Sequence, residues 1–148
     1  MSFQEKSFIV SLFANIVIFA AYSFYIYQSY PIESLLSQDN LAFWAKVILI
    51  YIPVSIVIKI VIYIIFLIIN SIATKEETPD QTDEMDRLIE LKATRNCFYV
   101  FFFGFVLSLG VIIIGWPVWI MFVSLFLSFS LTTFSWDISH IYYYRKGI

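Results

Sequence analysis

Four long runs of apolar residues account for most of the chain. They cover residues 7–27, 47–69, 97–114 and 118–134. Each run has the ~17–25 residues that a helix needs to cross a hydrocarbon core about 30 Å thick. A helix also satisfies its own backbone hydrogen bonds where no water is present. The pattern therefore predicts an all-α integral membrane protein, a four-helix bundle that occupies residues 1–148 as a single domain.

The connections between the runs differ in length. The turn at residues 115–117 is short, so we expect the last two helices to form a tight antiparallel hairpin, with the proline in the first turn of the final helix. Residues 28–43 form a longer connection, in which apolar positions at helical spacing after Pro31 predict a short helix lying on the membrane surface. Residues 74–82 are polar and typical of a linker.

Composition agrees with this interpretation. The chain is 61% hydrophobic and only 14% charged, too few charges to cover the surface of a soluble domain of this size. Its formal net charge of −2 gives no reason to expect a nucleic-acid partner. The partner implied by the sequence is the lipid bilayer.

The basic residues predict the orientation. With four spans, one side of the membrane would hold most of the Lys and Arg residues, and the other side would hold only Lys46. The first group contains Lys6, Lys75, Arg87, Lys92, Arg95, Arg145 and Lys146. Because basic residues are retained on the cytoplasmic side, we expect a multi-pass protein of the cell inner (plasma) membrane with both termini in the cytoplasm.

Each apolar run carries a stripe of small or polar residues at a spacing of three or four. Residues at this spacing share a helix face, and in membranes such faces allow close packing and hydrogen bonds between helices. The simplest arrangement turns all four stripes inward. From them we take a candidate intramembrane polar site: Lys59, Asn15, Ser55, Tyr63 and Ser108.

Lys59 is the unusual member of this set. It lies about ten residues from the inner end of its run, hence roughly 15 Å deep, where a charge costs at least ~2.5–3.5 kcal/mol. No Asp or Glu lies inside any of the four runs, so we expect no carboxylate partner within the chain. Lys59 is then either a proton-linked or anion-binding residue, or a lysine held by Asn15, serine hydroxyls and carbonyls freed at Pro53.

A charged, amphipathic helix is predicted at residues 82–96. Its apolar positions recur at a spacing of three and four, and its acidic start and basic end suit the helix dipole. Nothing interrupts it before Gly104, so we expect one unbroken helix over residues 82–114 that extends into the cytoplasm. Its exposed part is a candidate interaction surface: Asp83, Met85, Asp86, Arg87, Leu88 and Ile89.

Residues 83–93 also carry a resemblance. Read as D-E-x-x-D/R-x-I-x-x-K-A, they resemble a motif that precedes the third span in small prokaryotic four-helix membrane proteins of unknown function. The resemblance covers about a dozen residues and the overall layout. It implies the four-helix architecture and no activity.

One further group lies beyond the last run. Because a tight turn joins the last two helices, Asp137 should lie level with Arg95, and we expect an interfacial salt bridge between them. A metal site of carboxylates with His140 is the alternative, but one histidine with scattered carboxylates is weak support. We therefore expect no metal and no cofactor.

Functional motifs are otherwise missing from the sequence. Neither a zinc-protease pattern, a phosphate-binding glycine loop nor a nucleophile elbow is present. The favoured function is a non-enzymatic interaction or regulatory protein that contacts a second copy or another protein through its charged helix. The alternative is a small transporter or channel built around Lys59.

Overall fold

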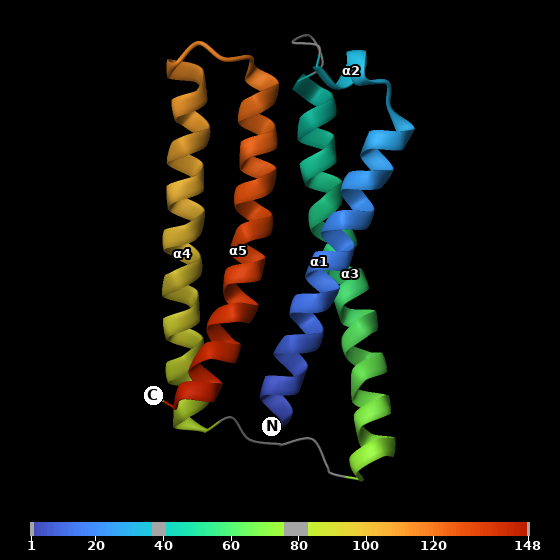
Figure 1. Cartoon of the computed structure of the whole chain (residues 1–148), viewed down its shortest axis with the longest axis vertical. Helices are drawn as coiled ribbons and strands as arrows, with labels where there is room; N and C mark the ends of the chain where they lie inside the picture. Colours follow the sequence, from blue (N-terminus) through green and yellow to red (C-terminus); the bar gives the residue numbers. More distant parts are fainter. Residues whose placement is uncertain (1, 37–40, 76–82, 148) are drawn as a thin grey trace.

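The computed structural model describes residues 2–36, 41–75 and 83–147, and its regular elements are all helices. They are α1 (Phe3–Ser29), α2 (Ile32–Leu36), α3 (Leu41–Thr74), α4 (Glu84–Ile113) and α5 (Val118–Lys146), shown in Figure 1. All except α2 are long and apolar enough to cross a membrane. The predicted all-α class with four long apolar helices is confirmed.

The four long helices run side by side, with α5 in the central position (Figure 1). α5 packs against α4, α1 and α3, whereas α4 has its main contacts with α5 alone. Both chain termini lie at one end of the molecule, which we call the terminal end, and the α4–α5 turn lies at the other, the hairpin end. The ring of four helices is therefore not closed by a substantial α3–α4 contact.

The helices extend beyond the apolar runs. α1 begins at Phe3, where the Ser2 hydroxyl accepts a hydrogen bond from the Glu5 backbone N–H, as an N-cap does. α3 continues from Leu41 to Thr74 and contains Pro53. Polar residues at the ends of a run belong to the same helix, because the backbone gains hydrogen bonds there without needing an apolar environment.

A short helix is present in the first connection, as predicted. α2 is held against the start of α3, because the buried Trp44 donates its indole N–H to the Leu35 carbonyl at 2.9 Å. Its position on a membrane surface stays a prediction. Residues 37–40 and 76–82, which include most of the predicted linker, lie outside the described residues.

α4 is a single helix over its whole length. Asp83 is its N-cap and forms a capping box with Asp86. The Asp83 carboxylate accepts a hydrogen bond from the Asp86 backbone N–H, and the Asp86 carboxylate accepts one from the Asp83 backbone N–H. The helix passes Gly104 without a break and is capped at Ile114. The prediction of one continuous helix is confirmed from residue 84 onward; Thr82 lies outside the described residues.

The hydrophobic core lies in the hairpin half, where α1, α3 and α5 meet. Its centre consists of Ile18, Tyr51 and Phe126, with the rings of Tyr51 and Phe126 4.9 Å apart. Tyr22 donates its hydroxyl to the Val47 carbonyl at 2.6 Å and so ties α1 to α3. Beyond Tyr51, α3 has no buried residue, so its contacts with the bundle are looser in the terminal half.

The α4–α5 interface uses small and polar residues, as the stripes predict. Ser108 is completely buried and shares a hydrogen bond of 2.8 Å with Ser124. Gly104 lies directly against Ser128, whose hydroxyl oxygen would be 2.2 Å from an added Cβ. One turn further, the Cys97 thiol contacts the Thr132 carbonyl at 3.4 Å. Small residues thus bring the two backbones close together.

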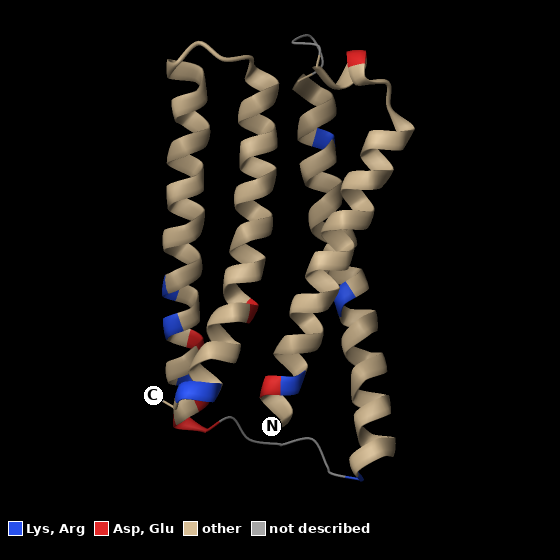
Figure 2. Ribbon diagram, viewed as in Figure 1, with Lys and Arg blue, Asp and Glu red and all other residues tan. Residues whose placement is uncertain are grey.

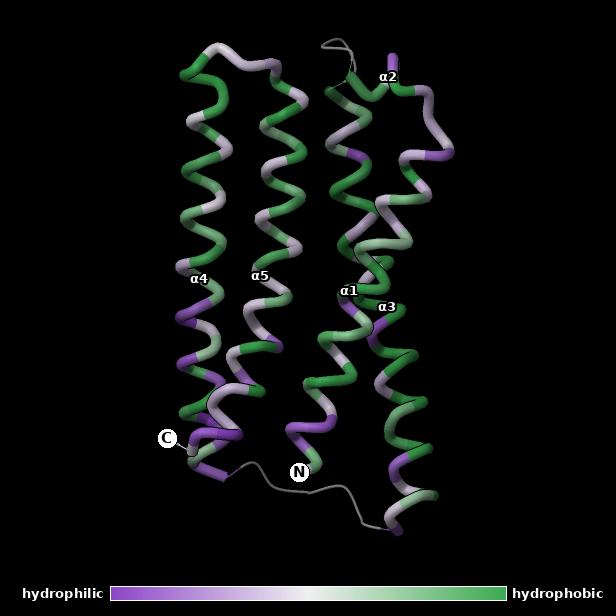
Figure 3. Tube along the Cα trace, in the orientation of Figure 1, coloured by the Kyte–Doolittle hydropathy of each residue, from purple (hydrophilic) through white to green (hydrophobic). Residues whose placement is uncertain are grey.

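The outer surface is apolar over most of the helix length. Hydrophobic residues predominate in the middle of all four long helices (Figure 3), and the most apolar stretch of α3 has no buried residue. Charged residues gather mainly at the terminal end (Figure 2), where Arg145 pairs with Glu5. An apolar surface of this extent is typical of contact with lipid rather than with water.

Gly104→Ala is expected to lower the free energy of unfolding by about 1–3 kcal/mol, because the new methyl group would force α4 and α5 apart. Gly110→Ala is the matched control, since no atom lies within 4 Å of its added Cβ, and its effect should be neutral or stabilising by up to ~1 kcal/mol. Unfolding in mixed micelles with increasing denaturing detergent measures both. Equal behaviour of the two variants would contradict the close contact at Ser128.

Candidate functional site: a buried aspartate and a lysine-lined cavity

A carboxylate lies at the centre of the candidate site. Asp137 of α5 has no exposed surface. Its Oδ1 accepts a hydrogen bond from the Ser11 hydroxyl at 2.8 Å, and its Oδ2 accepts one from the Asn15 amide. Both donors belong to α1, so these bonds link α1 and α5.

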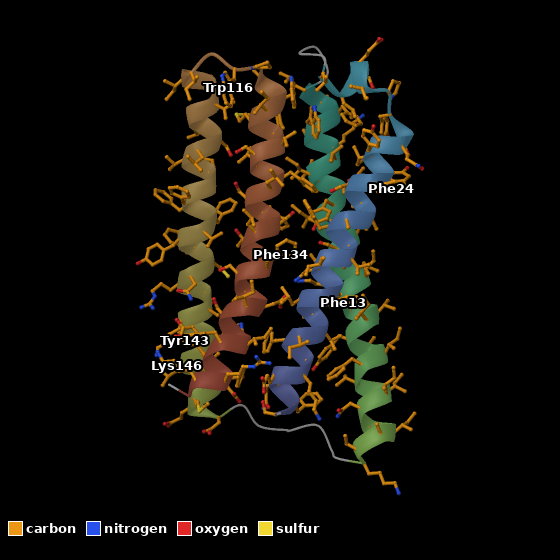
Figure 4. The ribbon with its side chains drawn as sticks, viewed as in Figure 1. Phe13, Phe24, Trp116, Phe134, Tyr143 and Lys146 are labelled. Carbon is orange, nitrogen blue, oxygen red and sulfur yellow. The ribbon has the colours of Figure 1, made fainter. Side chains whose placement is uncertain are left out.

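The local sequence explains this placement. Ser11 and Asn15 are four residues apart and share one face of α1. On α5, Phe126, Ser130 and Asp137 recur at the spacing of one buried face, and all three are buried. Phe134 also points from α5 toward α1 (Figure 4), where its ring lies 6.1 Å from that of Phe19. The aspartate thus lies at one end of a seam formed mainly by aromatic rings.

Lys59 of α3 lies near this carboxylate. The ammonium and the Asp137 carboxylate interact electrostatically, but they do not form an ion pair; within the described residues the ion pair is Arg145–Glu5. Contrary to expectation, a carboxylate of the chain therefore does lie near Lys59, although the two groups are not in direct contact. The sequence did not reveal this carboxylate because the last apolar run ends at residue 134. The helix α5 continues beyond that point, and α1 shields Asp137 from solvent.

The predicted pairing of Asp137 with Arg95 is also wrong. The two residues are level, as the tight turn requires, because the Asn96 amide donates to the Ser139 hydroxyl at 3.0 Å. However, it is Ser139 that faces α4. Asp137 is two residues earlier, about 200° away around the helix, and faces α1. Arg95 remains exposed.

A cavity of about 670 Å³ lies beside this centre in the terminal half of the molecule. We call it the Lys59 cavity. It is bordered by α1, by the second half of α3, by α5 and by the start of α4. Its lining consists of Phe3, Gln4, Ser7, Phe8, Val10, Ser11, Ala14, Lys59, Ile60, Ile62, Tyr63, Asp86, Glu90, Trp136, His140 and Tyr144.

Aromatic residues of α5 form one wall of the cavity. Trp136, His140 and Tyr144 follow at a spacing of four, and His140 is buried with its ring stacked 4.1 Å from that of Phe8. The Tyr144 hydroxyl donates to Asp86 at 2.7 Å. At the same end of α5, Tyr143 and Lys146 lie beside α4 (Figure 4), and the Lys92 ammonium sits 5.4 Å from the centre of the Tyr143 ring.

The structure brings together part of the predicted polar site. Lys59 and Tyr63 line the cavity, and Asn15 binds the aspartate beside it. Ser55 lies one turn from Lys59, but its hydroxyl donates to the Ile52 carbonyl of its own helix. Ser108 belongs to the α4–α5 interface in the hairpin half.

The predicted interaction surface is divided in the same way. Ile89 is completely buried, whereas Met85 is 39% and Leu88 50% exposed. Asp83 and Asp86 are engaged in the cap of α4, and Arg87 is exposed. α5 therefore covers one side of this face and leaves Met85 and Leu88 uncovered.

One pattern in the sequence could have indicated the cavity wall, namely three ring-bearing residues at a spacing of four. Trp136, His140 and Tyr144 share a helix face, but they lie after the last apolar run and resemble interfacial residues. Among the described residues, no cluster of three or more His, Cys, Asp or Glu side chains could hold a metal ion. No known protein family, curated protein or solved structure matches the chain.

Proposed function

We propose that this chain is a multi-pass membrane protein that binds a small ligand in the Lys59 cavity, as a small transporter or receptor would. The observation that carries the proposal is the position of Lys59 at the cavity without a bonded partner. Its ammonium borders the cavity, deep in the apolar part of the bundle, and makes no hydrogen bond or ion pair with the described residues. An ionisable side chain held there without a direct partner marks a functional position in membrane proteins.

The size and lining of the cavity agree with this function. Small-molecule sites have volumes of ≈300–1,000 Å³ and are mostly apolar with a few polar groups. The Lys59 cavity has about 670 Å³ and combines aromatic and aliphatic walls with one ammonium and two carboxylates. A lysine that served only packing would be expected to have its ammonium bonded to protein atoms.

The proposal includes an orientation. The four apolar helices support insertion in the plasma membrane, and the basic residues gathered at the terminal end support a cytoplasmic location for both termini. The cavity lies in the terminal half, so its ligand would enter from the cytoplasm or from the inner leaflet.

Cysteine labelling tests the proposal. In a Cys97→Ala background, Val10→Cys places a thiol on the cavity wall, and Phe13→Cys places one nearby on a side chain that is 69% exposed on the outer surface. A membrane-impermeant maleimide should modify Val10→Cys in inside-out vesicles, because the cavity admits water, and should leave Phe13→Cys in lipid unmodified.

Three outcomes of this labelling contradict the proposal. Absence of modification at Val10→Cys would mean that water does not reach the cavity. Modification from the outside alone would reverse the orientation. A modified Phe13→Cys would show that the surface facing away from the cavity is not in lipid.

A second function is favoured by the exposure of Met85 and Leu88. We propose that these two residues, with Arg87, form a contact surface through which the chain binds a second copy of itself or another protein. The capped start of α4 supports this surface, because the capping box fixes the helix on which the residues stand. In this role the protein is a non-enzymatic interaction or regulatory protein.

A further inference from the structure

The two ends of the Lys59 cavity carry opposite charges. At the deep end, Lys59 is the one lysine or arginine among the described residues that line the cavity. The neighbouring Asp137 carboxylate is occupied by Ser11 and Asn15 and does not line the cavity. The deep end thus presents a lysine side chain that has no direct partner among the described residues and can bind an anionic or acceptor group.

The other end of the cavity suits a cation. It is lined by Asp86 and Glu90 of α4 and by the rings of Phe8, Trp136 and Tyr144. Asp86 already accepts from the Tyr144 hydroxyl, whereas the Glu90 side chain has no bond with a described residue. Carboxylates beside aromatic faces are the usual surroundings of a bound ammonium group.

We infer that the ligand is a small zwitterion with an apolar body, which places a carboxylate at Lys59 and an ammonium group between Glu90 and the aromatic wall. The inference rests on the proposed function. A simple anion would suit Lys59 but would meet two carboxylates at the other end. An organic cation would suit those carboxylates but would meet Lys59. A zwitterion is the class that leaves neither end unpaired.

The distances along the helices permit such a ligand. Asp86 is bonded to Tyr144, which lies two turns beyond Asp137 on α5. Glu90 is one turn closer to Asp137 than Asp86 is. At ~1.5 Å rise per residue, Glu90 is therefore roughly one turn, about 5 Å, from the level of Asp137, near which Lys59 lies. The remaining aliphatic and aromatic lining can hold the apolar body.

Three related compounds test the inference on the purified full-length chain in lipid nanodiscs by titration calorimetry. L-phenylalanine carries both charges, 3-phenylpropionate lacks the ammonium group, and phenethylamine lacks the carboxylate. L-phenylalanine should bind at least ~10-fold more tightly than either analogue, because each analogue leaves one of the two charged ends of the cavity without a counter-charge. Lys59→Met and Glu90→Gln should each weaken L-phenylalanine binding by a similar factor, whereas Arg87→Gln, outside the cavity, should not.

The failures can be told apart. If 3-phenylpropionate or phenethylamine binds as tightly as L-phenylalanine, the zwitterion is wrong. If none of the three binds while Val10→Cys is still labelled from the cytoplasmic side, the zwitterion is wrong and the proposed function stands. If labelling also fails, both are wrong. A Lys59→Met chain that retains its thermal unfolding transition and full L-phenylalanine affinity overturns the inference as well.

Discussion

Replacing Asp137 with leucine is expected to lower the free energy of unfolding by about 2–6 kcal/mol, at about 1–3 kcal/mol for each of the two donors that lose their acceptor. The carboxylate has no exposed surface. Its loss leaves the Ser11 hydroxyl and the Asn15 amide without their acceptor, and it removes the charge that faces Lys59. Three polar groups on two other helices therefore lose a partner at once.

Asp137→Asn separates the loss of the hydrogen bonds from the loss of the charge. Asparagine has nearly the same shape and keeps one carbonyl oxygen, so it can still accept from one of the two donors, but it has no charge. We expect a loss of about 1–3 kcal/mol, the cost of leaving a buried polar group unsatisfied. A loss as large as that of leucine would assign most of the effect to the charge.

A double-mutant cycle with Lys59→Met measures the interaction between the two charges. If Lys59 and Asp137 stabilise each other, the second substitution should cost less in the presence of the first, with a coupling of about 0.5–3 kcal/mol. Unfolding in mixed micelles gives all four free energies. Additivity of the single effects would contradict the interaction, even if Asp137→Leu alone proved strongly destabilising.

The apolar pattern predicted the elements well because it reports on what a helix touches. Four runs predicted four long helices, and small residues such as Gly104 and Ser108 correctly predicted a close helix–helix contact. The lengths were underestimated, since polar residues at the ends of α1 and α3 continue the helix without contributing to the run.

The direction of a side chain around its helix was harder to predict than its depth. The tight turn correctly made Asp137 level with Arg95, but a rotation of two residues decides whether a side chain faces α4 or α1. Ser139 took the position facing α4, and Asp137 took the one facing Ser11 and Asn15. That choice depends on the packing of a third helix, which periodicity within α4 and α5 does not contain.

The cavity could not be predicted because it forms where the second half of α3 does not pack closely against the other helices. α3 is tightly held up to Tyr51 and has no buried residue after it, and Pro53 lies two residues further along. A proline removes one hydrogen bond of the helix and is a common site of bending. The position of Lys59 beside a cavity rather than lipid thus depends on how α3 lies relative to α1 and α5.

Two neighbouring positions of α4 should respond in opposite ways to substitution. Ile89 is completely buried on the side that α5 covers, whereas Leu88 is 50% exposed. Ile89→Ala is expected to lower the free energy of unfolding by about 2–5 kcal/mol, because it leaves a cavity in the α4–α5 interface. Leu88→Ala should change it by no more than ~0.5 kcal/mol, as surface substitutions do.

Association between two copies of the chain should depend on the exposed residues Met85 and Leu88 and not on the buried Ile89. In a Cys97→Ala background, Met85→Cys is expected to form a disulfide between two copies in native membranes upon mild oxidation, if the uncovered face binds a second copy. Leu88→Glu in that background should abolish the crosslink without changing the free energy of unfolding, because it places a charge in the contact while Ile89 still packs within the chain. Crosslinking that persists with Leu88→Glu would contradict the contact surface. A Leu88→Ala variant as unstable as Ile89→Ala would mean that this face belongs to the fold and not to a partner.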